Sequence, residues 1–223
     1  MDDLYAEFHH TEIFSKLPEN ERISLLKKAS HKKLQKKEYL AHQGDVWPYV
    51  MFVISGQIRW AMLATSGKEH LMFNLSKNQA FWAHSVFDGD SLPASLYAAR
   101  KSEVLLWDRE TILDYLRRYP DAMWETTKML TKTMRHAREI IYGLAFQPVA
   151  GRLASLLLEQ HNQSSSTQIK RDFTLNEVAT RVAATPEVVC RLLHQFQEDG
   201  ILEITRARIN IQDMKALEKA KKE

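Results

Sequence analysis

From Leu34 to Leu106, apolar residues fall in short runs that are separated by turn residues. Two of these runs, 50–54 and 58–63, are continuous or alternating, as expected of strands that bury one or both faces. Turn signals at this spacing predict a small β-sandwich or β-roll. The segment before it, 13–30, is predicted to be helical, with Pro18 opening a helix. The turn signals are Gly44-Asp45, Ser55-Gly56, Ser66-Gly67 and Asp88-Gly89-Asp90.

After Trp107 the apolar residues follow the period of helices. One helix is predicted over 109–118, because the pair Tyr119-Pro120 disfavours its continuation. A longer helix follows, with a seam of residues spaced alternately four and three apart, the pattern of helices that pack against each other. This pattern favours a helix through which two copies of the chain dimerise, and the alternative is a helix packed on its own β-domain. The seam consists of Met123, Thr127, Leu130, Met134, Ala137, Ile141 and Leu144.

The C-terminal part of the sequence opens with an amphipathic helix over 149–160 and a polar loop over 161–167. The stretch from Thr174 to Glu177 then matches a capping box, in which threonine and glutamate satisfy the backbone N–H groups of a helix start. Thr185-Pro186 signals a second start, since proline at the first helical position sacrifices no hydrogen bond. Two short helices joined by a three-residue turn have the proportions of a helix-turn-helix.

The second of these helices is the predicted DNA-reading helix. In the major groove, arginine binds guanine with two hydrogen bonds and glutamate accepts one from cytosine. Two alternating runs, 201–204 and 208–211, predict a hairpin or wing whose arginines are placed to contact phosphate. The candidate DNA-binding residues are Thr174, Thr185, Pro186, Glu187, Cys190, Arg191, Arg206 and Arg208.

Composition limits the classes of protein that need to be considered. The chain has 223 residues, 44% hydrophobic and 26% charged, and a formal net charge of +3, which is too small to identify a nucleic-acid binder. No run approaches the roughly 18 apolar residues of a membrane helix, and the first residues lack the order of a secretory signal. We therefore expect a cytoplasmic protein that does not bind membranes. The single cysteine, Cys190, excludes a disulfide framework and a four-cysteine iron–sulfur cluster within one chain.

Together these features resemble the bacterial transcription regulators of the CRP/FNR family, typified by the cyclic AMP receptor protein and the fumarate and nitrate reductase regulator. The resemblance covers nearly the whole chain and rests on residues 13–17, 43–45 and 53–58, on the long helix and, most specifically, on 187–202. It implies an α+β fold. The three expected parts are an effector-binding β-roll over 1–108, of the double-stranded β-helix type found in cyclic-nucleotide-binding domains, a helical connector and dimerisation helix over 109–147, and a winged helix-turn-helix domain over 148–223.

The resemblance also implies roles for single residues and for partners. Residues matching Glu187 and Arg191 contact bases in the family. Pro186 departs from the arginine or valine often found at its position, which changes the expected operator. Ala183 stands where a turn glycine is common, so a positive φ there would be strained. The implied assembly is a homodimer on double-stranded DNA with an inverted-repeat operator, its reading helices about 34–36 Å apart, and RNA polymerase is a candidate partner.

Cyclic-nucleotide-binding members of the family hold ribose and phosphate with a Gly-Glu pair and an arginine in a short cassette. Here the corresponding residues, 81–96, contain no Gly-Glu pair and no arginine. A buried phosphate without a guanidinium lacks its charge partner. We therefore expect that cyclic AMP does not bind tightly.

The residues that replace the cassette are mostly aromatic or soft. They suit a flat apolar effector, such as an aromatic metabolite or a haem ligated by His70 or His84. The alternative is that these side chains fill the core of the roll and that the regulator needs no effector. No histidine has the spacing of paired metal ligands, so no metal site is predicted. The candidate effector-pocket residues are Trp60, Met72, Phe81, Trp82, His84, Ser85, Pro93, Ser95, Tyr97, Met123 and Thr127.

A cupin-like metal enzyme, with Asp88 and Asp90 near His84, is the alternative from another functional class. Such an enzyme needs two closely spaced histidines on one strand, and the sequence contains no His-x-His. We therefore expect a non-enzymatic DNA-binding regulator. An effector in the roll would shift the dimer between two arrangements about a hinge at 143–148, provided that it binds the two arrangements with different affinity.

Overall fold

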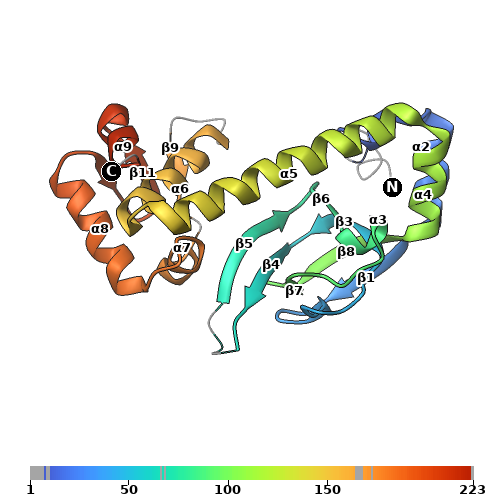
Figure 1. The fold of residues 1–223 in the computed structure, drawn as a ribbon, viewed down its shortest axis with the longest axis horizontal. Coiled ribbons are helices and arrows are strands. Elements are labelled where there is room, and N and C mark those ends of the chain that lie inside the picture. The colour runs from blue at the N-terminus through green and yellow to red at the C-terminus, as the bar shows by residue number, and fades with distance from the viewer. Residues whose placement is uncertain are drawn as a thin grey trace. The chain divides into compact units, whose positions relative to one another are not determined.

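The computed structural model describes Phe8 and residues 11–65, 67, 69–163, 168–171 and 173–221 (Figure 1). The chain forms two compact units, residues 1–133 and 134–223, and each has its own hydrophobic core. The boundary falls inside one continuous helix, α5 (Pro120–Phe146). The division into three parts that the sequence suggests stays a prediction.

Two antiparallel sheets of four strands each form the roll of the first unit. The strand orders are β1-β8-β3-β6 and β2-β7-β4-β5, so the chain passes repeatedly from one sheet to the other. The predicted small roll is confirmed. Its strands are β1 (Ser30–Leu34), β2 (Tyr39–Ala41), β3 (Tyr49–Ser55), β4 (Gln57–Leu63), β5 (Glu69–Ser76), β6 (Ala80–Trp82), β7 (Ser95–Ala98) and β8 (Ser102–Asp108).

Short helices close the roll. The helix predicted over 13–30 is divided into a 3-10 helix, η1 (Phe14–Lys16), and α2 (Glu19–Lys28), with Pro18 as the N-cap of α2. The buried indole Nε1 of Trp107 donates to the carbonyl oxygen of Leu25 at 2.7 Å, which ties α2 to β8. Among the described residues, this unit also contains α3 (His84–Phe87) and α4 (Arg109–Arg118), besides the first part of α5.

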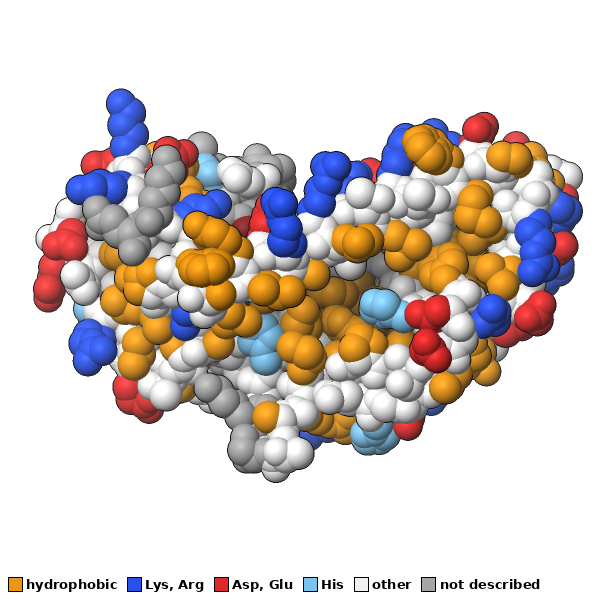
Figure 2. Space-filling view, viewed as in Figure 1, with side chains coloured by type: hydrophobic (Ala, Val, Ile, Leu, Met, Phe, Trp, Pro, Cys, Tyr) orange, Lys and Arg blue, Asp and Glu red, His pale blue; other side chains and the backbone are white. Residues whose placement is uncertain are grey.

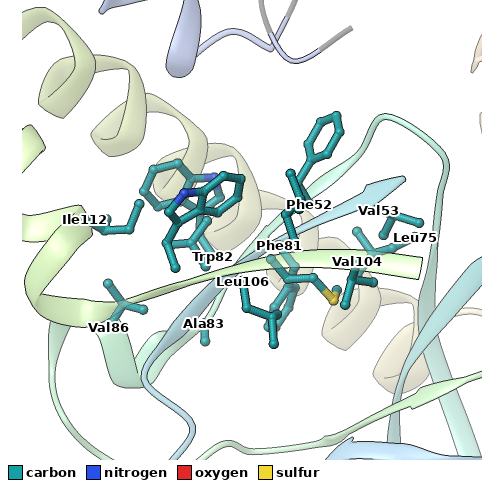
Figure 3. Close-up of a cluster of buried hydrophobic side chains, with 14 of the residues drawn as sticks. Phe52, Val53, Leu75, Phe81, Trp82, Ala83, Val86, Val104, Leu106 and Ile112 are labelled. Atoms are coloured by element: carbon teal, nitrogen blue, oxygen red, sulfur yellow. The ribbon is translucent and has the colours of Figure 1, made fainter. Parts of the chain in front are cut away.

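Aromatic and aliphatic side chains fill the interior between the two sheets. Strand β3 is buried from Val50 to Val53, as its uninterrupted apolar run predicts. Helix α4 has the predicted bounds and adds Ile112 to the same cluster, part of which is drawn in Figure 3. In that view Phe81 and Trp82, both predicted pocket residues, lie among buried apolar neighbours.

The second unit combines helices with a small antiparallel sheet of order β10-β11-β9. The first helix extends to Gln163, so part of the loop predicted over 161–167 is helical, and residues 164–167 lie outside the described residues. Strand β9 and helix α9 are additions to the predicted elements. The elements are α6 (Val149–Gln163), β9 (Gln168–Lys170), α7 (Leu175–Arg181), α8 (Pro186–Glu198), β10 (Leu202–Ile204), β11 (Arg208–Ile211) and α9 (Met214–Ala220).

One glycine of the roll has no room for a side chain. Gly56, in the turn between β3 and β4, has φ +86°, and a Cβ atom there would lie 2.4 Å from the carbonyl oxygen of Lys101 and 2.6 Å from Cα of Ser102. These are backbone atoms at the start of β8, so they cannot move without disturbing the sheet.

We predict that Gly56→Ala destabilises the first unit by about 3 kcal/mol or more, because the clash adds to the strain of an alanine in the left-handed region. Gly44→Ala is the matched control: Gly44 has φ +95°, but a Cβ atom there would have no neighbour within 4 Å. This variant should lose only about 1–2 kcal/mol of stability, the cost of placing an alanine in the left-handed region. Denaturant unfolding measures both, and equal losses would contradict the steric argument.

Candidate DNA-binding surface and effector region

The first helix of the helix-turn-helix starts with the predicted capping box. Glu177 N donates to Thr174 Oγ1 at 3.2 Å, and Thr174 N donates to Glu177 Oε2 at 2.7 Å. The helix start is therefore held by its own sequence, and Thr174 is exposed beside it. The capping role of Thr174 is confirmed, whereas its contact with DNA stays a prediction.

The turn between α7 and α8 contains a strained residue. Ala183 has φ +50°, which an L-residue other than glycine adopts at a cost of about 1–2 kcal/mol. The predicted strain at this position is confirmed. Ala184 N donates to the carbonyl oxygen of Ala179 at 2.9 Å, which closes the turn.

Helix α8 buries one face in the core of the second unit. Its buried residues are Val189, Leu193 and Phe196, which recur every three to four positions. Thr185 is the N-cap and Pro186 takes the first helical position, as predicted, although the Thr185 side chain does not cap the helix. The helix is therefore oriented by the core, and the opposite face of its first two turns is not part of that core.

The outer side of the first two turns of α8 carries the predicted reading residues. Glu187 and Arg191 are exposed, and Pro186 and Cys190 are half-buried. Hydrogen bonds from Thr185 and from a backbone N–H lower the pKa of the Glu187 carboxyl, which is fully exposed. At neutral pH this surface thus presents one carboxylate acceptor and one guanidinium donor, the two groups that read cytosine and guanine.

The predicted wing is confirmed as the hairpin β10–β11. Its tip is closed by Arg208 N donating to Thr205 Oγ1 at 3.0 Å and by Thr205 N donating to the carbonyl oxygen of Arg208 at 2.9 Å. Arg206 and Arg208 are exposed there, and the Arg208 guanidinium also contacts the side-chain oxygen of Gln168.

Two further basic residues lie beside the wing, and the sequence pattern does not predict them. Strand β9 pairs with β11 so that Lys170 is opposite Arg208. Arg171 follows, and its Nη1 donates to the carbonyl oxygen of Thr205 at 3.1 Å. Both side chains are exposed. We call these four residues, Lys170, Arg171, Arg206 and Arg208, the basic wing. The basic wing therefore combines two segments that are far apart in the sequence.

The structure brings several predicted pocket residues together inside the roll. Trp60 and Phe81 are buried with ring centroids 4.9 Å apart, and Trp60 also stacks on His84 at 6.0 Å. Trp82 is buried and stacks on Phe87, while Met72 packs against the same cluster. These aromatic side chains contact one another directly.

Other predicted pocket residues do not join this cluster. Tyr97 pairs with Arg59 rather than with Trp60, so it lies on the opposite face of the sheet, where its hydroxyl contacts both carboxylate oxygens of Glu69 at 2.9 Å. Burial is the main reason that the pKa of Tyr97 is raised to about 12. Tyr97 therefore does not lie with Trp60 and Phe81, and its place in an effector pocket stays a prediction.

The two serines among the predicted pocket residues are buried and hold loops of the roll. Ser85 Oγ donates to the carbonyl oxygen of Asp90 at 2.6 Å and accepts from Trp47 N, and Ser95 Oγ accepts from Gln43 N at 2.9 Å. Pro93 is exposed. These serines already have partners in the protein, so a structural role accounts for their burial.

Haem ligation by His70 or His84 stays a prediction. The rings of Trp60 and Phe81 are in contact, so a planar group does not lie between these two rings. His84 is exposed and lies nearly parallel to Trp60, with an interplanar angle of 15°. Among the residues that the structure describes, no group of three or more His, Cys, Asp or Glu side chains is placed to hold a metal ion.

The seam of α5 is largely uncovered in the single chain (Figure 2). Met134 and Ile141 are 74% and 66% exposed, and Met123, Thr127 and Leu144 are also exposed, while Leu130 and Ala137 are half-buried. Trp124, Tyr142 and Phe146 add exposed aromatic surface that the seam pattern does not predict. No helix in the described part of the chain is long and apolar enough to cross a membrane.

A winged helix-turn-helix on one chain with a β-roll and a long helix defines a DNA-binding regulator with a ligand-sensor type of domain. Residues 31–119 match the family model of the cyclic nucleotide-binding domain, and residues 151–220 match that of the Crp-like helix-turn-helix domain. The chain belongs to the CRP/FNR family of transcription regulators.

Similar proteins are regulators of this kind. The chain is 26% identical over 179 residues to the cyclic AMP receptor protein of Thermus thermophilus, an alignment that covers 79% of this chain and 81% of the relative. The fold is similar to that of FixK2 from Bradyrhizobium japonicum, with a TM-score of 0.75, 20% identity and coverage of 86% of this chain and 96% of the other. A CooA variant from Carboxydothermus hydrogenoformans gives a TM-score of 0.76 with 23% identity, covering 88% and 89%.

Proposed function

We propose that this protein is a homodimeric, sequence-specific transcription regulator that binds an inverted-repeat operator in double-stranded DNA. The observation that carries the proposal is the outer face of α8, where Glu187 and Arg191 are exposed at the end of a helix whose other face is buried. The basic wing supplies four exposed cations for phosphate contacts. Base contacts by α8 give the sequence preference, and the wing sets the position on the duplex.

Dimerisation through α5 is part of the proposal. Four large apolar residues of the seam are exposed in the single chain, namely Met123, Met134, Ile141 and Leu144. An apolar stripe of this kind is stabilised when a second copy covers it. A twofold axis then places the two reading helices about one DNA turn apart.

We further propose that the effector, where one acts, is a small apolar or aromatic molecule and not cyclic AMP. Residues 81–96 contain no arginine, and Arg109, which lies nearby, donates from Nη1 to the carbonyl oxygen of Ser85 at 3.2 Å. A cyclic phosphate would thus lack its guanidinium partner. An effector that binds the two arrangements of the dimer differently would change DNA affinity by population shift.

The contact between Trp60 and Phe81 favours a second candidate, a regulator whose roll is filled by its own side chains and that needs no effector. Mass spectrometry of small molecules released on denaturation separates the two candidates. The same proposal includes a non-enzymatic role, a cytoplasmic location and RNA polymerase as a partner, because the proposed target is DNA and similar proteins are transcription regulators. A cupin-like enzyme has no support in the described residues, which contain no metal-ligand group.

The reading role of α8 predicts different effects for two arginines. Arg191→Ala should reduce discrimination between operator and scrambled DNA by about 1–3 kcal/mol per half-site, because a base contact is lost. Arg206→Ala should weaken binding to both duplexes alike. The salt dependence of binding should fall by the amount expected for the loss of about one phosphate contact per wing. Fluorescence anisotropy at several salt concentrations, with a duplex selected from a random pool, measures both. Full discrimination by Arg191→Ala would refute the reading role.

The seam predicts that Ile141→Lys prevents dimerisation. Two lysines would face each other in an apolar contact, and an uncompensated buried charge costs about 3–5 kcal/mol. Glu139→Lys introduces the same side chain at an exposed position away from the seam and should leave the dimer intact. Analytical ultracentrifugation gives the association state, and an unchanged dimer of Ile141→Lys would exclude this helix as the interface.

The missing arginine predicts weak binding of cyclic AMP. We expect a dissociation constant about tenfold or more above that of the positive control, since the lost charged hydrogen bond is worth about 1.5–3 kcal/mol. Isothermal titration measures it, with the cyclic AMP receptor protein of Thermus thermophilus as the positive control. Binding in the low micromolar range would show that other residues hold the phosphate.

A further inference from the structure

The side chains of Arg152 and Gln147 lie where three helices of the second unit end. Arg152 Nε donates to the carbonyl oxygen of Val182 at 2.8 Å, and its Nη1 donates to that of Gln147 at 2.7 Å. Gln147 Nε2 donates to the carbonyl oxygen of Lys221 at 2.8 Å. Gln147 directly follows α5, while Val182 and Lys221 are the C-caps of α7 and α9. Two side chains thus join the ends of three helices.

Helix ends of this kind need hydrogen-bond donors. The last carbonyl groups of a helix have no partner within it and carry partial negative charge. The guanidinium of Arg152 is planar, permanently charged and rich in donors, so it can satisfy two of these ends together. Burial lowers its pKa, which indicates that the charge is partly removed from water. The two carbonyl oxygens compensate for that desolvation.

Two glycines leave the space that this junction requires. A Cβ atom at Gly143 would lie 3.1 Å from Gln147 Oε1 and 3.7 Å from Arg152 Cγ. A Cβ atom at Gly151 would lie 3.2 Å from the carbonyl oxygen of Ala220, at the end of α9. The contacts at 3.1 and 3.2 Å are shorter than ordinary van der Waals contact, so the junction is closely packed.

The carbonyl group that Arg152 holds belongs to the peptide directly before the strained Ala183. The φ angle of Ala183 describes rotation relative to that peptide, so fixing the peptide opposes a return of Ala183 to an unstrained conformation. Helix α8 begins three residues later, at Pro186. The direction in which α8 leaves the turn therefore depends on the contact between Arg152 and Val182.

We propose that Arg152 is a positioning residue for the reading helix. It holds the turn of the helix-turn-helix in its strained form and links that turn to the end of α5, without itself contacting DNA. The inference rests on the proposed DNA-binding function. A movement of the last turn of α5 would be transmitted toward α8 through this guanidinium.

The test uses the full chain and a duplex that the wild-type protein selects from a random pool. Arg152→Met should lower affinity for this duplex by about tenfold or more, because two charged hydrogen bonds are lost. Adding Ala183→Gly should recover about threefold or more of that loss, since glycine adopts positive φ without being held. Ala184→Gly is the matched control next to it and should recover nothing. Arg152→Lys, which keeps the charge, should lose less affinity for the duplex than Arg152→Met.

Amide hydrogen exchange provides a readout that does not need DNA. In Arg152→Met, exchange at residues 183–185 should increase, while the amides of the α6 core stay protected. If Arg152→Met does not fold, Arg152→Lys replaces it in the same comparison. Unchanged affinity and unchanged exchange, or equal recovery by both glycine variants, would overturn the inference. Absence of any selected duplex with the wild type would instead refute the proposed function, and the exchange result would still decide the role of Arg152.

Discussion

The second unit depends on one requirement, that helix α8 buries a single face completely. Val189, Leu193 and Phe196 are 0%, 7% and 4% exposed and occupy that face. A helix held in this way cannot rotate about its axis, so Glu187 and Arg191 point outward whatever they bind. The reading surface is therefore oriented by core packing. The strained turn and the wing then decide where this fixed face lies within the domain.

Much of the fold could be predicted from the sequence because its signals are local. The helix from Arg109 to Arg118 has the predicted bounds, since its N-cap Asp108 and the following Tyr119-Pro120 act within one turn. The capping box at Thr174 and the proline start of α8 are equally local. The strain at Ala183 was expected from the family resemblance and not from local signals, because Ala183 stands where a turn glycine is common, and its φ of +50° is strained for alanine.

The parts that could not be predicted depend on pairing between distant segments. Strand β9 has only three residues, too few for an alternating pattern to be recognised, and it is a strand because β11 pairs with it. Lys170 and Arg171 were missed for that reason. The sequence could not show that Tyr97 and Trp60 lie on opposite faces of the sheet, because all four residues of β7 are buried and the strand has no alternating pattern. Only the pairing with Arg59 settles its side.

The basic wing has a consequence for how such a protein searches a chromosome. Residues 146–223 contain 11 basic and 10 acidic residues, so the positive charge is concentrated at the wing and is not general to the domain. Affinity for DNA of any sequence depends on the number of phosphates that the protein neutralises. Under the proposed function, four cations per protomer make about eight phosphate contacts in a dimer, a number at which affinity falls steeply as salt rises. The wing, and not the domain as a whole, would then hold the protein on the duplex while it slides between sites.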